Sequence, residues 1–177
     1  MIKTAKRISI IGGCGTGKTT LASNLGKELK LPVYHIDGIH HLENWRARDK
    51  NERDEMILEK VSKDEWIIDG TYHSTLKQRL EKSDVIIYLD YSTLDQLKGI
   101  LGRYIKNHGK EKKEIPGCKE KMDLEFFCYT LKWRKNKRHQ IIEAIENIQD
   151  DKILIFRTRK ELNIWYKDKF GKKISMC

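Results

Sequence analysis

The feature that most constrains the fold of this chain is a glycine-rich stretch, Gly12 to Thr19, which fits the pattern G-x-x-x-x-G-K-[ST]. It follows an apolar run, Arg7 to Ile11, and precedes a segment in which Leu21, Leu25 and Leu29 recur at helical spacing. A strand, a glycine-rich turn and a helix together aim backbone N–H groups and the positive end of a helix dipole at one anion. The sequence therefore predicts a loop that binds phosphate.

Each position of this stretch has its own place in the expected chemistry. Lys18 is predicted to reach the β- and γ-phosphates of a nucleoside triphosphate, and the Thr19 hydroxyl to bind the Mg²⁺ that bridges them. Cys14 has two interpretations, a small residue that fills space or a thiol whose pKa is lowered by the lysine and the helix N-terminus. We expect ATP as the donor. The residues expected to bind it are Gly12, Gly13, Cys14, Gly15, Thr16, Gly17, Lys18, Thr19 and Thr20.

Short apolar runs, each followed by a polar or helical stretch, predict five buried strands. They are Arg7 to Ile11, Pro32 to Ile36, Trp66 to Asp69, Val85 to Leu89 and Ile153 to Phe156. Strands that alternate with helices favour a parallel sheet covered on both faces. A chain of 177 residues is also the size of one domain, so we expect a single α/β domain over residues 1–177.

The longest gap between predicted strands, Asp90 to Asp151, is too long for a simple crossover. Its basic part with Gly and Pro, Asn107 to Lys119, is predicted to form an exposed lid, within an insertion of about residues 104–135. The segment Glu120 to Ile148 carries apolar residues at helical spacing, which predicts one long helix or two.

Positive charge is concentrated in the same region. The formal net charge is +10, and the stretch from Lys98 to Arg138 holds 13 Lys and Arg residues against 5 Asp and Glu. Such a field attracts polyanions, a class that includes nucleotides, nucleic acid and anionic lipid. Charge alone does not choose among these partners.

Two carboxylates stand at the carboxyl ends of predicted strands, where ligands bind in open α/β sheets. Asp69 is the candidate that holds Mg²⁺ through water, and a turn role is the alternative. Asp90 has the same placement, but Ser92 and Thr93 follow it, so capping a helix is at least as good an interpretation. We rank Asp69 above Asp90.

Asp37 follows a third strand, where a carboxylate can accept a proton from an acceptor hydroxyl or orient it. A turn role in Asp37-Gly38 is equally consistent. His35, His40 and His41 gather nearby, but no carboxylate or Cys stands at ligand spacing, which argues against a metal site.

Three arginines are candidates for neutralising charge on the phosphate chain. Arg134 and Arg138 are four residues apart on a predicted helix, so their guanidiniums share one face and can converge on one anion. Arg103, placed before the lid, is expected to join them. A solvated basic face is the ordinary alternative for such a run. With Lys18 and Asp37, these arginines complete the predicted catalytic set.

The cysteines, Cys14, Cys118, Cys128 and Cys177, form no C-x-x-C pair or zinc spacing, and the chain starts without a signal-peptide pattern. We therefore expect a reducing, cytoplasmic location. Neither a long apolar run nor a prenylation motif is present, so no membrane anchor is expected. Monomer and homodimer are both compatible with the sequence.

Several motifs together resemble the adenylate-kinase-related P-loop proteins often named DNA topology modulation proteins. The stretch Trp66 to Tyr72 is similar to that family's W-h-h-D-G-N-Y, and Pro116-Gly117-Cys118 with Asp123-Leu124-Glu125-Phe126 is similar to its P-G-C and D-L-E-F pieces. The resemblance covers nearly the whole chain. It implies a three-layer P-loop NTPase fold, strand order 2-3-1-4-5, a mobile lid and ATP as donor.

The chain departs from adenylate kinases on the acceptor side. Those kinases carry D-G-F-P-R, whose Arg grips a monophosphate, whereas this chain has Asp69 to His73 without an Arg, which argues against AMP as acceptor. They also commonly begin the lid helix with an Arg near the place of Gly99 here, which leaves Arg103 as the nearest substitute.

The sequence thus favours transfer of the γ-phosphoryl group of ATP to a small nucleoside, nucleotide or other hydroxyl- or phosphate-bearing acceptor. The alternative is a nucleotide-switched regulator that binds DNA through Lys98 to Arg138, although no nucleic-acid-binding motif supports it. A GTPase is disfavoured because the base-reading pattern [NT]-K-x-D is absent.

Overall fold

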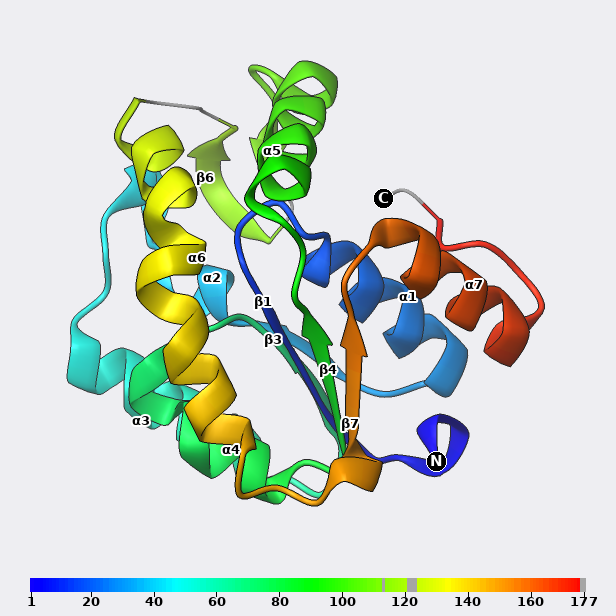
Figure 1. Cartoon of the computed structure of the whole chain (residues 1–177). Helices are drawn as coiled ribbons and strands as arrows, with labels where there is room; N and C mark the ends of the chain where they lie inside the picture. The colour runs from blue at the N-terminus through cyan, green and yellow to red at the C-terminus, as the bar shows by residue number, and fades with distance from the viewer. Residues whose placement is uncertain (113, 121–123, 176–177) are drawn as a thin grey trace.

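The computed structural model describes residues 1–112, 114–120 and 124–175. Asp123 and Cys177, named above, lie outside these described residues. A central parallel sheet is covered by helices on both faces (Figure 1). Its strands are β1 Arg7–Gly12, β2 Val33–His35, β3 Trp66–Asp69, β4 Val85–Leu89 and β7 Ile153–Phe156.

The sheet has the order β2-β3-β1-β4-β7, all pairs parallel. Since β7 is the fifth strand of this sheet, the predicted order 2-3-1-4-5 is confirmed. A separate antiparallel hairpin, β5 Glu111–Lys112 with β6 Ile115–Lys119, lies in the predicted lid. The helices are α1 Lys18–Leu29, α2 Ile36–His40, α3 Lys50–Val61, α4 Leu76–Lys82, α5 Thr93–Asn107, α6 Leu124–Ile145 and α7 Arg159–Phe170.

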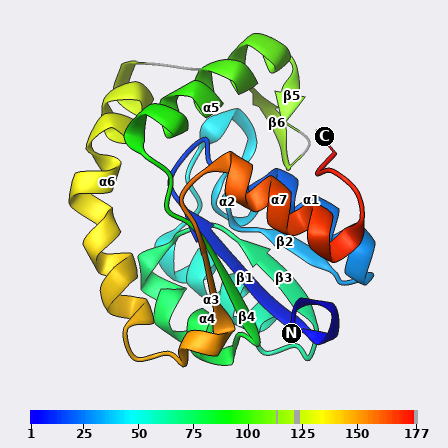
Figure 2. The ribbon, with the colours of Figure 1, turned by 45° about the vertical axis from the view of Figure 1, so that its right-hand side comes forward.

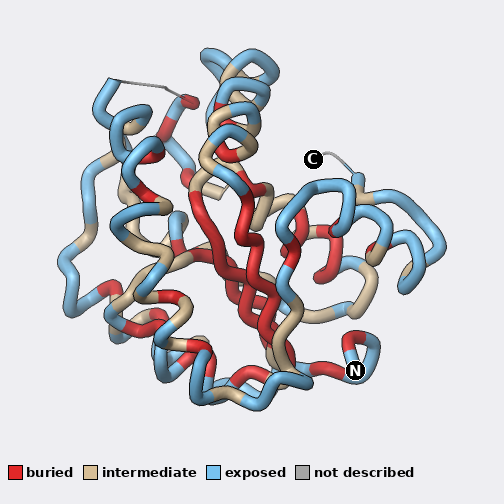
Figure 3. The backbone as a smooth tube through the Cα atoms, in the orientation of Figure 1, coloured by how far each residue is buried: buried red, intermediate tan, exposed pale blue. Residues whose placement is uncertain are grey.

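The two faces of the sheet bury different helices. On one face α1 and α7 pack against side chains such as Ile8 and Ile10 of β1. On the other face α4 and α6 pack against Ile11 and Tyr88, and α3 packs against Trp66 and Ile68 nearer the edge. The central strands are therefore buried from both sides, as Figure 3 shows, and Figure 2 shows the two helical layers from a second direction.

Local sequence explains where the main helices begin and end. α1 follows Gly17, which adopts a left-handed backbone, and it ends at Leu29 because Lys30 turns left-handed before Pro32. Ser92 caps α5 by accepting from the backbone N–H of Asp95. The interpretation of Asp90 as a helix cap is therefore wrong, because Ser92 holds the N-cap position. Residues 124–145 form one long helix, α6, which settles the choice between one helix and two.

The lid hairpin is less exposed than expected. Ile115 and Cys118 are buried, while Pro116, Gly117 and Lys119 of β6 are exposed. Among the described residues, none of the helices combines the length and hydropathy that crossing a membrane requires.

Candidate functional site

The glycine-rich loop closes tightly between β1 and α1. Gly15 and Gly17 have φ of 68° and 91°, which favours glycine at both positions. The ammonium of Lys18 and the hydroxyl of Thr16 both donate to the carbonyl oxygen of Gly13, at 2.8 and 2.9 Å. The lysine therefore lies along the loop, within reach of the space above it.

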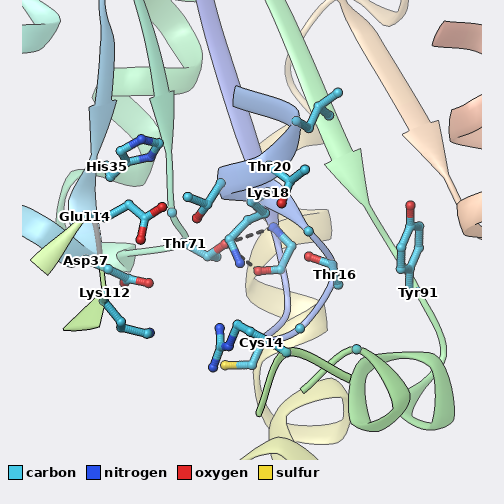
Figure 4. Close-up of a pocket in the computed structure, with 18 of the residues that line it drawn as sticks. Cys14, Thr16, Lys18, Thr20, His35, Asp37, Thr71, Tyr91, Lys112 and Glu114 are labelled. Atoms are coloured by element: carbon cyan, nitrogen blue, oxygen red, sulfur yellow. Dashed lines mark hydrogen bonds between the residues drawn. The ribbon is translucent and has the colours of Figure 1, made fainter. Parts of the chain in front are cut away.

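One large cavity runs along this loop and joins it to the predicted acceptor side (Figure 4). Of the residues predicted to bind the nucleotide, those on the cavity wall are Gly12, Cys14, Gly15, Thr16, Gly17, Lys18, Thr19 and Thr20. Asp37 and Arg103 also line it, so these two predicted site residues share the cavity with the loop. Gly13 is not part of this wall, and its carbonyl accepts the hydrogen bond from Lys18.

Asp69 is held directly against the first turn of α1. The Thr19 hydroxyl donates to its Oδ2 at 2.9 Å, and His35 Nδ1 lies 2.6 Å from its Oδ1. Burial opposes protonation of His35, but the hydrogen bond to Asp69 and the carboxylate charges around it raise its pKa overall. Thr19, the predicted magnesium ligand, and Asp69, predicted to hold the ion through water, are thus brought together by α1 and β3.

A short loop after β3 connects three parts of the site. Thr71 Oγ1 exchanges hydrogen bonds of 2.9 Å with both the N–H and the carbonyl of Gly12, and the Tyr72 hydroxyl donates to Asp37 at 3.1 Å. Behind the loop, the fully buried Arg79 donates to the carbonyls of Gly70 and Tyr72 at 3.0 and 3.4 Å. Burial lowers the pKa of Arg79 to about 10. This loop fixes the phosphate loop relative to Asp37.

A guanidinium that the sequence did not indicate lies at the far end of the phosphate loop. Arg159, the first residue of α7, donates to the carbonyl of Gly15 and lies 5.6 Å from the ring centroid of Tyr91. A Cβ at Gly99 would lie 2.0 Å from the Gly15 carbonyl and 2.3 Å from the Arg159 guanidinium. The position of Gly99, where the resemblance suggests an arginine, therefore has no room for a side chain. The guanidinium of Arg159 fills the space beside it.

The other end of the cavity surrounds Asp37. Glu114 and Lys112 of the lid lie on the same side of the cavity as Asp37, as Figure 4 shows. Burial lowers the pKa of Lys112, whose ammonium lies 4.8 Å from the ring centroid of Trp45. Burial also raises the pKa of Tyr72, with the charge of Asp37 acting in the same direction, so this phenol stays protonated.

Hydrogen bonds hold the lid hairpin over the end of the cavity that contains Asp37. The backbone N–H of Trp45 donates to Cys118 Sγ at 3.1 Å, and its indole N–H donates to the carbonyl of Lys119 at 3.1 Å. A Cβ at Gly38 would lie 2.3 Å from the carbonyl of Glu114. The hairpin and the segment around α2 therefore touch backbone to backbone, with the acceptor end beneath them.

The predicted arginines have protein partners in this structure. Arg134 and Arg138 both bind the buried carboxylate of Asp90, at 2.6 and 2.9 Å, and neither lines the cavity. Their common helical face does converge on one anion, but that anion is a side chain at the end of β4. Arg103 lines the cavity and pairs with Glu120 at 3.1 Å.

Cys14 lies in the loop wall, and burial raises the pKa of its thiol despite the nearby Lys18 charge. This direction matches the interpretation as a residue that fills space and contradicts a thiol of lowered pKa. Within the described ranges, no three His, Cys, Asp or Glu side chains gather so as to hold a metal ion by themselves.

The site also contains residues that sequence reasoning did not select, among them Arg159, Tyr91, Thr71 and Arg79. Thr71 and Tyr72 carried a signal, since they stand in the motif after β3. Arg159 carried none, because 144 residues separate it from Gly15. Arg79 resembles any helical arginine until its burial is known.

The sequence profile of the family described as "ATPase family associated with various cellular activities (AAA)" matches residues 8–90, a little under half of the chain. This stretch includes the phosphate loop, Asp37, Asp69 and Asp90. No curated protein matches the chain.

Two solved kinases have a similar structure. Shikimate kinase from Acinetobacter baumannii in complex with shikimate has a TM-score of 0.59 and 18% identity, covering 96% of this chain and 97% of that one. A gluconokinase from Sinorhizobium meliloti 1021 has a TM-score of 0.52 and 14% identity, covering 87% of this chain and 83% of that one. The chain thus has the P-loop kinase-like fold.

Proposed function

We propose that this protein is a kinase that moves the γ-phosphoryl group of ATP to a small acceptor bearing a hydroxyl or phosphate group. The observation that carries the proposal is one cavity lined both by the phosphate loop and, across from it, by Asp37. The two structural relatives are kinases of small molecules, which supports the same reaction class here.

The residues present fit a magnesium-bound nucleoside triphosphate. The Thr19 hydroxyl and the Asp69 carboxylate, 2.9 Å apart, offer the oxygen atoms that Mg²⁺ prefers, and Mg²⁺ is usually held by few protein ligands together with phosphates and water. Lys18 supplies a positive charge at the loop, and the N-terminus of α1 supplies backbone donors. Thr19 would bind the ion, and Asp69 would act through water.

The proposed reaction divides between the two ends of the cavity. When bound, MgATP supplies the γ-phosphoryl group, which passes to the acceptor oxygen as its P–O bond to ADP breaks. Asp37 would accept the proton of an attacking hydroxyl at its carboxylate, while the Tyr72 hydroxyl orients that carboxylate. Lys18, with Arg103 once released from Glu120, would offset the charge on the transferring phosphate.

Arg159 and Tyr91 make the nucleotide end suitable for a base. The guanidinium and the phenol ring stack at 5.6 Å beside the loop, and both line the cavity. Such planar groups stack on a purine without reading its edges. ATP stays the expected donor, as the sequence predicts, and the resemblance to the DNA topology modulation proteins stays a prediction.

The direct test is ADP formation from ATP in the presence of an acceptor panel. We expect Lys18→Ala to reduce turnover by at least about 100-fold, because a charge aimed at the transferring phosphate is removed. Lys27→Ala, an exposed lysine on the same helix, is the matched control and should keep full activity. Equal turnover in the two variants would refute the assignment of the loop.

The rival proposal is the nucleotide-switched regulator that binds DNA. Its basic segment is less available than the sequence suggests, because Arg103, Arg134 and Arg138 are engaged by carboxylates. A steep fall of duplex binding with salt would support this rival, since released counterions accompany contacts to phosphates.

A further inference from the structure

The cavity also bears on what kind of acceptor is used. We infer that the acceptor is an uncharged ring compound bearing hydroxyl groups, of the nucleoside or sugar class, and that phosphorylated or carboxylated analogues are rejected. The inference rests on the proposed function and deepens it. It follows from how the charges around Asp37 are already paired.

Two cations at the acceptor end, Arg53 and Arg103, are engaged by protein carboxylates. Arg53, whose side chain is 10% exposed, pairs with Asp54 at 2.6 Å and also donates to Ser74. On the lid side, Glu120 is 3% exposed and pairs with Arg103 at 3.1 Å. Because an anionic acceptor needs positive charge that is not already neutralised, these two pairs reduce the positive charge available to it.

Lys112 completes this pattern on the lid. Its ammonium lies 3.7 Å from Glu120 and over the ring of Trp45. Burial lowers the pKa of this lysine, and the nearby Arg103 charge acts in the same direction. A lysine in this setting is a weaker site for a phosphate or carboxylate than an unpaired surface lysine.

Negative charge faces the place where the acceptor hydroxyl must lie. Asp37 and Glu114 both act electrostatically on His35 and on Lys112. The two carboxylates therefore lie at the same part of the cavity (Figure 4). A second anion brought beside them would meet repulsion from like charges. Two carboxylates instead accept hydrogen bonds from several hydroxyl groups.

The walls of this end suit a ring. Tyr72, Tyr129 and Trp45 line it, so a flat or chair-shaped ring can lay its apolar face on an aromatic surface. Burial raises the pKa of Tyr72 and of Tyr129, so both phenols stay neutral and can donate to or accept from hydroxyl groups. These neutral polar walls, beside the paired Arg53, Arg103 and Lys112, match an uncharged polyol.

The test compares matched acceptors in the ATP-dependent assay: nucleosides against their monophosphates, and hexoses against hexose phosphates and aldonic acids. We expect ADP formation with at least one uncharged member, and kcat/KM at least about tenfold lower for its anionic partner. The nucleoside and sugar arms identify the source of the ring. Turnover with anionic acceptors only would overturn the inference while leaving the kinase proposal intact.

Two charge variants sharpen the result. Glu114→Gln should raise kcat/KM for the anionic acceptor and so reduce the preference for the uncharged one. Glu55→Gln, which changes an exposed carboxylate on α3, is the control and should leave this preference unchanged. Lys137 lines the cavity and forms no ion pair among the residues that the structure describes. If Lys137→Ala raises the KM of the acceptor severalfold, Lys137 binds an anionic group of the acceptor and the inference is wrong. An unchanged KM of the acceptor supports the inference.

The failure of the underlying function would look different. If no acceptor of either class raises ADP formation above the rate of Lys18→Ala, the kinase proposal fails and the inference fails with it. Direct binding separates the two cases further: an uncharged ring that binds the ATP-free protein, with its phosphate ester binding at least tenfold more weakly, is the expected result.

Discussion

The hydroxyl of Thr19 donates to the carboxylate of Asp69 across 2.9 Å, although 50 residues separate them in the chain. Parallel pairing of β1 with β3 brings this about, because it sets Ile10 opposite Asp69 and leaves the first turn of α1 just beyond the strand end. The expected magnesium ligand Thr19 and the carboxylate expected to hold the ion through water are therefore adjacent as a consequence of sheet register.

This contact predicts that Asp69→Asn weakens the binding of Mg²⁺ to the nucleotide complex by about 10- to 100-fold. This is the usual effect of losing a group that orients a metal ligand. Titrating Mg²⁺ against ATP binding measures it. Asp64→Asn is the control, because Asp64 is exposed just before the same strand. An unchanged Mg²⁺ affinity in Asp69→Asn would show that Asp69 does not help to hold the ion.

Gly99 and Gly102 offer a matched pair on α5. We expect Gly99→Ala to destabilise the protein by about 1–3 kcal/mol and to weaken ATP binding, since its Cβ would lie 2.0 Å from the Gly15 carbonyl. Gly102→Ala meets nothing within 4 Å and should be neutral or slightly stabilising, because alanine favours helix. Denaturant unfolding and ATP titration of both variants check this, and equal behaviour would contradict the close packing of α5 on the loop.

The ion pairs of Asp90 predict a structural role for Arg134 and Arg138. Arg138→Ala should lower the free energy of unfolding by about 2 kcal/mol, because Asp90 is 4% exposed and loses a charged donor, while kcat changes by less than about threefold. Lys135→Ala, exposed on the same helix, should change neither. A fall of kcat by orders of magnitude without lost stability would instead restore the catalytic interpretation.

Asp84 predicts a dependence of stability on pH. Burial opposes its ionisation, but hydrogen bonds from the side chain and backbone of Arg7 and from the N–H of Lys6 lower its pKa overall. A carboxyl group with a lowered pKa adds stability above about pH 4, its unfolded range, and loses it as pH falls through the folded pKa.

The measurement for Asp84 is the difference in free energy of unfolding between the natural chain and Asp84→Asn. We expect a clear difference at pH 7 that shrinks steadily below pH 4. A difference that stays constant down to pH 2 would show that the carboxylate charge is not what the contact stabilises.

The sheet was predictable because its information is local. Each buried strand is a short apolar run, and the loop motif fixes which strand stands at the centre, so Trp66–Asp69 and Val85–Leu89 were predicted with the bounds that the structure has. The resemblance implied the strand order. The hairpin was not predicted, because β5 spans two residues and Pro116 and Gly117 in β6 favour a turn.

The site was only partly predictable for the opposite reason. Lys18 and Thr19 follow from one continuous motif, but the partner of Arg134 and Arg138 depends on where α6 crosses the end of β4. Helical spacing correctly placed both arginines on one face and could not identify Asp90 as the anion. Arg159 is still harder to predict, because only the sheet topology brings the start of α7 beside the loop.

The most direct test of the central claim follows the γ-phosphoryl group itself. With ATP labelled at that group and an acceptor that raises turnover, we predict label on the acceptor, and at least about 100-fold less with Asp37→Asn although ATP binds as before. The binding control matters because Asp37 lies across the cavity from the phosphate loop. Label that appears only as inorganic phosphate, equally with and without Asp37, would contradict a phosphotransferase.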